Sequence, residues 1–228
     1  MQEKLNYLLK KYSVAAAAEL DGRETVMVDG KRLPLLPWRN ERRFLELKSL
    51  VDSGEINGIS VMRSLRVVRS GGELLTELYR EFDIAQFVLG SRLCEIFATG
   101  DDKYALNVVA RTSDGFVCSF ELAATLDESD DIIDKHEIIA RSGVACDRAV
   151  DTQIPQSSIY LYGKNSGRYT DVDAELYGLD ADDCATVRAA FETARTGLDL
   201  SADAAYLNRC VEAAKRSMET VENVMVEG

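Results

Sequence analysis

The first 52 residues carry two helical patterns separated by a segment of turns. Over residues 3–12, three leucines fall on one side of a short amphipathic helix. The pairs Asp21-Gly22 and Asp29-Gly30 follow, and Asp-Gly readily supplies the positive backbone angles of tight hairpins. The segments around these pairs therefore predict a three-stranded meander. A second helix is predicted from residue 41 to residue 52, before Ser53-Gly54.

Strand patterns dominate the middle of the chain. Residues 56–69 alternate apolar with polar or basic side chains, as a half-exposed strand does. After Gly71-Gly72, apolar residues at helical spacing predict a helix that ends at Gly90. Six further segments carry strand-forming residues bounded by turn signals, namely residues 92–99, 103–112, 116–125, 134–142, 144–151 and 157–163. Two more helices are predicted over residues 180–196 and 201–221.

Helices at both ends with antiparallel strands between them indicate an α+β fold. We expect a large, predominantly antiparallel, open-faced sheet with helices packed on one face. An uncovered face rich in Val, Ile, Leu, Phe and Tyr is unfavourable in water, so we expect it to form an oligomer interface. The alternative is a sheet that is split or curled and buried within one chain.

The charge balance narrows the choice of partners. The 228 residues include 39 acidic and 27 basic side chains, which gives a formal net charge of −12. Such a chain repels phosphate backbones and anionic lipid surfaces, so neither nucleic acid nor membrane is an expected partner. Its 5 cysteines include no Cys-x-x-Cys pair and predict buried thiols in a reducing compartment. No apolar run approaches the roughly 20 residues that span a bilayer, and we expect a cytoplasmic protein.

The search for catalytic and cofactor motifs is mostly negative. No Gly-x-Gly occurs, so the glycine turn of a dinucleotide-binding domain is absent, and Gly163-Lys164-Asn165 lacks the other residues of a phosphate loop. The one histidine, His136, lies in a predicted strand, where a surface position is expected. Acidic doublets have no calcium-loop spacing. We expect no metal site, and no cofactor bound by this chain alone.

One segment carries a family resemblance. Residues 71–90 read GGELLTELYREFDIAQFVLG. They resemble a helix motif of the Gfo/Idh/MocA family, the NAD(P)-dependent sugar and polyol oxidoreductases that include glucose-fructose oxidoreductase and inositol dehydrogenase. The family pattern is Gly-Gly-x-Leu-x-Asp-x-Gly-x-His-x-x-Asp, usually closed by Leu-x-Gly. The matching residues are Gly71, Gly72, Leu74, Asp83, Leu89 and Gly90.

Two further segments extend this resemblance over about residues 39–226. Upstream, the stretch RNERRFLELKSLVDSGEING resembles the family's Arg-bearing stretch and Lys-containing helix. The residues in register are Arg39, Phe44, Lys48, Gly54, Glu55 and Ile56. Downstream, the two C-terminal helices resemble the helix pair that precedes the family's terminal strand. The resemblance implies the α+β fold of the family's C-terminal domain.

The departures from the family pattern concern its chemistry. Arg80 stands where the family has a histidine that assists proton transfer, Thr76 stands where it has an aspartate, and no Glu-Lys-Pro motif is present. Arginine, with a pKa above about 12, cannot act as a general base near neutral pH. The family's Rossmann domain does not fit before Arg39. We therefore expect a helix and hairpin appendage over residues 1–38 and an oxidoreductase C-terminal-like α+β domain over residues 39–228.

The resemblance and its departures lead to three functional hypotheses. We favour a stand-alone, non-catalytic homologue of the substrate-binding and oligomerisation domain, forming a dimer or tetramer and able to bind a small sugar- or polyol-like ligand. The second hypothesis is an oxidoreductase subunit whose nucleotide-binding domain, with NAD(P), lies on a partner chain. The third is a cofactor-free lyase or isomerase in which Asp83 or Glu77 is the base and Arg80 the electrostatic stabiliser.

The candidate ligand pocket joins the Arg39 stretch to the Arg80 helix. Arg39, Arg80 and Asp83 are the predicted substrate-binding residues. On one helix face, Arg80 and Asp83 with Glu77 would make a polar cluster for an anionic or hydroxylated ligand. The alternative for these side chains is a ladder of surface ion pairs.

Overall fold

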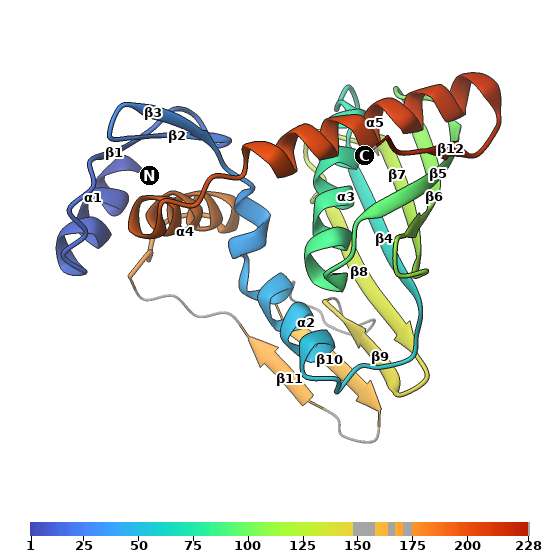
Figure 1. Cartoon of the computed structure of the whole chain (residues 1–228), viewed down its shortest axis with the longest axis horizontal. Coiled ribbons are helices and arrows are strands. Elements are labelled where there is room, and N and C mark those ends of the chain that lie inside the picture. Colours follow the sequence, from blue (N-terminus) through green and yellow to red (C-terminus); the bar gives the residue numbers. More distant parts are fainter. Residues whose placement is uncertain (148–157, 164–166, 171–174, 228) are drawn as a thin grey trace. The chain divides into compact units, whose positions relative to one another are not determined.

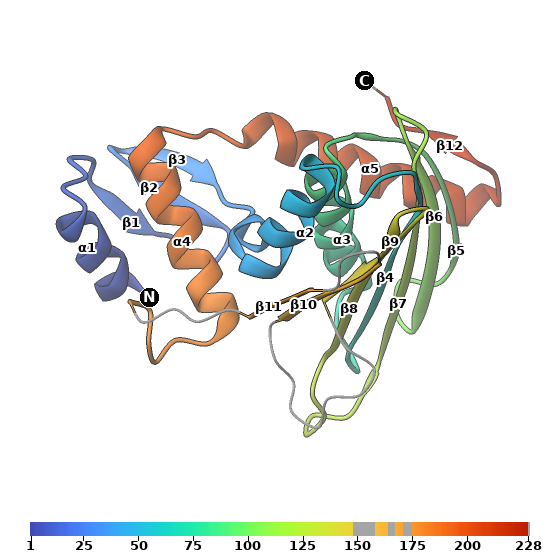
Figure 2. The same cartoon turned by 90° about the horizontal axis from the view of Figure 1, so that it is seen from below.

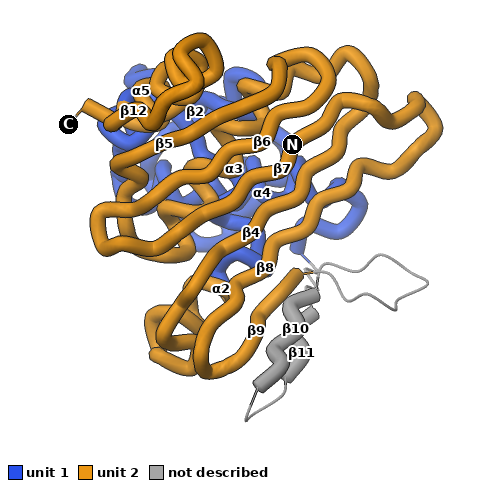
Figure 3. The backbone as a smooth tube through the Cα atoms, turned by 90° about the vertical axis from the view of Figure 1, so that its right-hand side faces the viewer, with its two compact units in different colours: residues 1–45, 172–205 blue, residues 46–171, 206–228 orange. Residues whose placement is uncertain are grey.

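The computed structural model describes residues 1–147, 158–163, 167–170 and 175–227, and for residues 158–163 and 167–170 it describes the backbone (Figure 1). The chain divides into two compact units (Figure 3). Unit 1 comprises Met1–Leu45 and Val172–Ala205, and unit 2 comprises Glu46–Asp171 and Tyr206–Gly228.

Unit 1 is a small layer of helices on a three-stranded sheet. Its elements are α1 (Gln2–Lys11), β1 (Ala18–Leu20), β2 (Thr25–Val28), β3 (Lys31–Pro34), the 3-10 helix η1 (Pro37–Asn40) and α4 (Ala181–Thr196). The strand order β1-β2-β3 is antiparallel and confirms the predicted meander. Asp29 and Gly30 both have positive φ, as a two-residue hairpin turn requires.

The division of the chain differs from the predicted boundary after residue 38. The reason is α4, whose buried Val187 and Ala190 belong to one hydrophobic cluster with Leu5 of α1 and Val26 of β2. Asp180 caps the N-terminus of α4, since its side chain accepts a hydrogen bond from the Asp183 N–H, and the helix ends before the left-handed Gly197. A segment from late in the sequence thus completes the core of the first unit.

Unit 2 contains the large sheet. Its strands are β4 (Ile59–Arg69), β5 (Leu93–Gly100), β6 (Ala105–Thr112), β7 (Val117–Leu126), β8 (Ile133–Ala140), β9 (Gly143–Cys146), β10 (Ser158–Gly163), β11 (Gly167–Thr170) and β12 (Val224–Met225). Helix α3 (Leu74–Leu89) lies wholly in this unit, whereas α2 (Arg42–Asp52) and α5 (Ser201–Thr220) each have residues in both units.

The sheet has one covered face and one open face. Its order is β11-β10-β9-β8-β4-β7-β6-β5-β12, in which β4 and β7 run parallel and the other neighbours are antiparallel. Along β6 buried and exposed residues alternate strictly. Helices α3 and α5 lie against the same face (Figure 2), and the opposite face of the central strands is the open face. The predicted α+β, open-faced fold is confirmed.

Two polar side chains of helix α5 form hydrogen bonds with the backbone of β5, near one edge of the sheet. The Tyr206 hydroxyl donates to the Leu93 carbonyl at 2.7 Å, and the Ala98 N–H donates to Ser217 Oγ at 2.9 Å. Strand β12, which follows α5, pairs with β5. The sequence predicted this terminal strand only through the family resemblance.

Several strand boundaries differ from the predicted ones. Strand β4 begins at Ile59 rather than residue 56, because Gly58 has a left-handed φ of 64°. Strand β9 ends at Cys146, and residues 148–151 of the predicted strand lie outside the described residues. Strand β11 is an addition to the predicted set.

The five cysteines are free thiols, and the prediction that they are buried holds for three of them. Cys118, Cys146 and Cys210 are buried, whereas Cys94 and Cys184 are half-buried. Burial raises the pKa of Cys118 and of Cys210 to about 12. Within the described part of the chain, no helix has both the length and the apolar character needed to cross a membrane.

Candidate functional site

Helix α3 brings charged side chains into the covered layer of the sheet. Its apolar residues, such as Phe82, are fully buried, and the Phe82 ring packs edge-on against Phe120 of β7 with ring centroids 5.1 Å apart. The same helix carries Arg80, Glu81 and Asp83, which are 9%, 0% and 0% exposed. Buried charges of this kind require partners.

Strands β4 and β8 supply the partners. In the antiparallel register, Ser64 lies opposite His136, and Arg66 lies opposite Asp134. Ser64 and Arg66 are two positions apart on β4, and Asp134 and His136 are two positions apart on β8. All four side chains therefore project from the same face of the sheet. That face is the covered one, because Ser64 and His136 are both buried.

His136 is bonded through both ring nitrogens. Nδ1 lies 2.6 Å from Asp147 Oδ2, and Nε2 lies 2.7 Å from Glu81 Oε2. The backbone repeats the first contact, since the His136 N–H donates to Asp147 Oδ1 at 2.7 Å and the Asp147 N–H donates to the His136 carbonyl at 3.1 Å. The imidazole is therefore held between two carboxylates in a fully buried position.

Arginines connect these carboxylates to others. Arg80 donates to Glu81 Oε1, and its Nη2 lies 3.1 Å from Asp134 Oδ2. Arg66 forms ion pairs with Glu77 and, at 3.3 Å, with Asp134. Residues from α3, β4, β8 and the end of β9 thus form one connected set. We call it the His136 cluster, and it comprises Ser64, Arg66, Glu77, Arg80, Glu81, Asp134, His136 and Asp147.

The electrostatics of the cluster favour charged groups at its centre. Burial alone would raise the pKa of Glu81, but His136 and Arg80 outweigh it and lower that pKa to about 2. Burial alone would lower the pKa of His136, but Asp147, Glu81 and Asp134 outweigh it and raise that pKa to about 10. Both shifts favour an imidazolium beside a carboxylate.

The four predicted site residues lie in different surroundings in the structure. Glu77 and Arg80 join the His136 cluster, and Asp83 is fully buried on the same helix. Arg39 belongs to unit 1, where it pairs with Asp203 at 2.8 Å. Arg39 and Arg80, which the sequence predicted to share a pocket, thus belong to different units.

Two expectations about this region are wrong. Arg80 is not part of a ladder of surface ion pairs on α3, because its side chain is only 11% exposed and pairs with Asp134 of β8. A surface position does not describe His136, which is 0% exposed. One sequence signal was available, namely polar residues at every second position of two neighbouring strands, at Ser64 and Arg66 and at Asp134 and His136.

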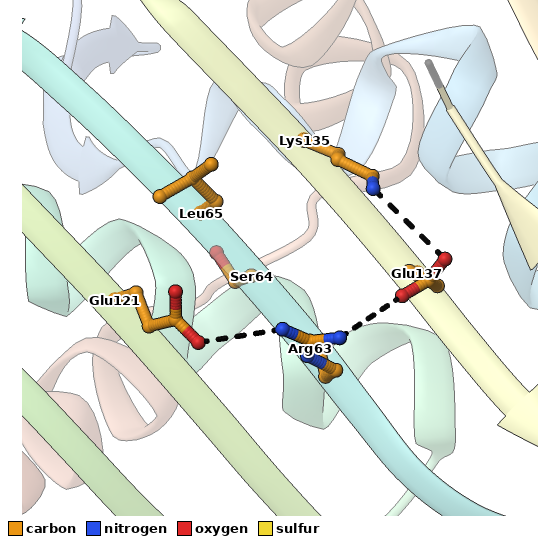
Figure 4. A pocket seen from close by; sticks show the side chains of 6 residues that line it. All are labelled: Arg63, Ser64, Leu65, Glu121, Lys135 and Glu137. Atoms are coloured by element: carbon orange, nitrogen blue, oxygen red, sulfur yellow. Dashed lines mark ion pairs between the residues drawn. The ribbon is translucent and has the colours of Figure 1, made fainter. Parts of the chain in front are cut away.

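The open face carries a second group of charges, in a shallow pocket over β7, β4 and β8 (Figure 4). Arg63 lies between two carboxylates, 3.5 Å from Glu121 and 3.6 Å from Glu137. Lys135 lies 4.0 Å from Glu137. Arg63 is half exposed, so solvent screens these ion pairs far more than those of the His136 cluster.

Solved structures that resemble this chain include oxidoreductases, among them inositol dehydrogenases. The expected similarity to Gfo/Idh/MocA-type oxidoreductases is thus confirmed at the level of the fold. A putative oxidoreductase from Thermotoga maritima superposes with a TM-score of 0.64 at 13% identity, covering 85% of this chain and 63% of that chain. The scyllo-inositol dehydrogenase from Lactobacillus casei with bound NAD(H) and scyllo-inositol gives a TM-score of 0.62 at 15% identity, covering 84% and 63%.

A third similar structure is a myo-inositol dehydrogenase from Corynebacterium glutamicum, with a TM-score of 0.62, 17% identity and coverage of 85% of this chain and 64% of that chain. The chain thus spans less than two thirds of these proteins. No protein-family model and no curated protein matches the sequence.

Proposed function

We propose that this chain is a non-catalytic assembly module related to the C-terminal domain of NAD-dependent sugar and polyol dehydrogenases. The observation that carries the proposal is the His136 cluster. It engages Glu77 and Arg80, two of the candidates for chemistry on α3, in ion pairs within the domain. An acid, base or electrostatic stabiliser must instead reach a substrate. These contacts therefore argue against the lyase or isomerase hypothesis.

The open face of the sheet is the surface through which the module would assemble, and its partner is a second copy of this chain. Apolar side chains alternate there with charged ones, and the β6 residue Val109 is 44% exposed. The ion pairs on this face join three basic side chains with three acidic ones, namely Arg63, Arg111 and Lys135 with Glu95, Glu121 and Glu137.

This balance of charge favours the open face as the contact surface between two copies of the chain. A chain with a net charge of −12 repels its own copies, so a stable contact between copies favours a surface that contributes no net charge. Face-to-face packing of two such sheets buries the exposed apolar residues of both chains and brings each chain's ion pairs into a drier environment.

The test is the molar mass of the full chain in solution, measured by light scattering and by sedimentation over a range of concentrations. We expect a dimer or tetramer that Val109→Arg converts to monomer without loss of the folded far-UV spectrum. The matched control is Tyr177→Arg, since Tyr177 is 84% exposed and belongs to unit 1. A monomeric wild-type chain, or equal effects of the two variants, would contradict the assembly role.

We also propose that the chain alone binds no nicotinamide cofactor and turns over no polyol. Its sequence lacks the glycine turn that holds a dinucleotide phosphate. Titration of NADH or NADPH, followed by nucleotide fluorescence, should leave the signal unchanged. Saturable binding by the pure chain, or polyol oxidation with added NAD, would overturn the non-catalytic role.

A further inference from the structure

We propose that Glu81, Asp134 and His136 form a binding site for a divalent transition-metal ion of the Zn²⁺ or Mn²⁺ type. Each residue offers one ligand atom, and the three atoms all lie within 4.8 Å of one another. The set combines an imidazole nitrogen, which suits zinc, with two carboxylate oxygens, which suit manganese as well. The sequence predicted no metal site, because its one histidine would have to be joined by ligands scattered along the chain.

The spacing of the ligand atoms suits one ion. His136 Nε2 lies 2.7 Å from Glu81 Oε2 and 3.7 Å from Asp134 Oδ1. Two ligand atoms that each lie about 2.0 to 2.2 Å from a metal are about 3 to 3.5 Å from each other. To hold an ion, the shorter distance must lengthen and the longer one shorten, each by up to about half an ångström.

The far side of the imidazole is arranged as in a metal-bound histidine. Ligating histidines almost always donate their other ring N–H to a carboxylate or a carbonyl, which fixes the ring and its tautomer. Asp147 occupies this position, 2.6 Å from Nδ1 and fully buried. Its other oxygen accepts the backbone N–H of His136, so the orienting carboxylate is itself held.

The two acidic ligands are also oriented from behind. Arg80 contacts Glu81 through Oε1, which leaves Oε2 directed at the histidine. Asp134 lies closest to Arg80 and Arg66 through Oδ2, at 3.1 and 3.3 Å, and its Oδ1 is the atom nearer to Nε2. The Ser64 hydroxyl donates to Glu81 Oε2 and helps to orient that carboxylate.

The ion would enter past Asp134. The side chains of His136 and Glu81 are 0% exposed, whereas that of Asp134 is 16% exposed. Ligation requires an unprotonated Nε2, so binding releases a proton and strengthens as the pH rises. The site is separate from the open face, and it stands or falls independently of the oligomeric state.

The experiment uses the full chain after removal of metals with a chelator. Zn²⁺ titrated into it by calorimetry should bind with a stoichiometry of one ion per chain. Asp134→Asn should weaken that binding by roughly tenfold or more, since a ligand is lost. The matched control is Glu137→Gln, on the same strand but on the open face, which should leave zinc affinity unchanged. A Cys94→Ser, Cys184→Ser variant excludes binding at the half-buried thiols.

A second measurement needs no variant of the cluster. Mn²⁺ bound to the wild-type chain should show pulsed electron paramagnetic resonance coupling to one imidazole nitrogen, and the chain has only 1 histidine. Failure of both ions to bind at one per chain would overturn the metal site. So would zinc affinity that survives Asp134→Asn or disappears with the cysteines, or bound Mn²⁺ without nitrogen coupling.

Discussion

The two faces of strands β4 and β8 carry charged side chains at neighbouring positions, exposed to solvent on one face and buried on the other. On the open face, Arg63 lies 3.5 Å or more from its carboxylate partners and is 50% exposed. One residue further along β4, Ser64 belongs to the buried His136 cluster, where the imidazole contacts are 2.6 and 2.7 Å. Strand alternation alone therefore places one set of charges in water and another in the core.

Burial, rather than the number of ion pairs, decides how much a charged side chain contributes to the stability of this domain. Exposed ion pairs contribute little, because solvent and salt screen them. A buried charge that loses its partner is costly, because nothing replaces the water it gave up. Each of the following variants tests one side of this contrast.

The largest effect is expected for Glu81→Gln. The change keeps the shape of the side chain but removes the buried carboxylate that pairs with Arg80 and with Nε2 of His136. Removing one member of a buried ion pair typically costs about 3 to 5 kcal/mol. Urea unfolding should show this loss in the metal-free protein. A cost below about 1 kcal/mol would mean that the cluster is not the tight network that its distances indicate.

The next effect is a stability that depends on pH through the same pair. The folded chain holds the His136 proton more tightly than the unfolded chain, so this contribution is complete below pH 6.5 and is lost as the pH rises through about 10. Glu81 has a lowered pKa, so its contribution is complete above pH 4.5 and is lost as the pH falls through about 2.

Unfolding free energies between pH 4 and pH 10 measure this dependence. The cluster should contribute most between about pH 4.5 and 6.5, and the difference between wild type and His136→Gln should shrink as the pH rises above that range. A difference that stays constant from pH 6 to pH 10 would show that His136 is neutral in the folded chain.

The smallest effect is expected for Arg63→Gln on the open face. Its ion pairs with Glu121 and Glu137 are half exposed, so the stability of the folded chain should change by about 0 to 1 kcal/mol and less in high salt. Chemical unfolding at low and high ionic strength measures the change. A loss as large as that of Glu81→Gln would remove the contrast between the faces.

Local sequence signals predicted most of the elements. Leucine spacing predicted α1, the Asp29-Gly30 pair predicted the β2–β3 hairpin, and Gly90 marked the end of α3. These features are decided within a few residues of the chain. The unit boundary was missed because it depends on α4, which packs against strands more than 150 positions earlier in the sequence.

The candidate site was predicted only where its contacts are local. Helical spacing brought Glu77 and Arg80 together, because residues three apart share a helix face. Their ion-pair partners Arg66 and Asp134 come from strands, and periodicity along a helix does not specify which strand residues it meets. The register of β4 with β8, which aligns Ser64 with His136, is a property of the folded sheet.

The contrast between the two faces depends most directly on the protonation state of His136 in the metal-free chain. Because it is the only histidine, its ring nitrogens give unambiguous signals in a ¹⁵N-detected magnetic resonance spectrum. We predict protons on both ring nitrogens throughout pH 6 to 8, as expected for an imidazolium held between Asp147 and Glu81. An imidazole that titrates near pH 6.5, like one in water, would contradict the account.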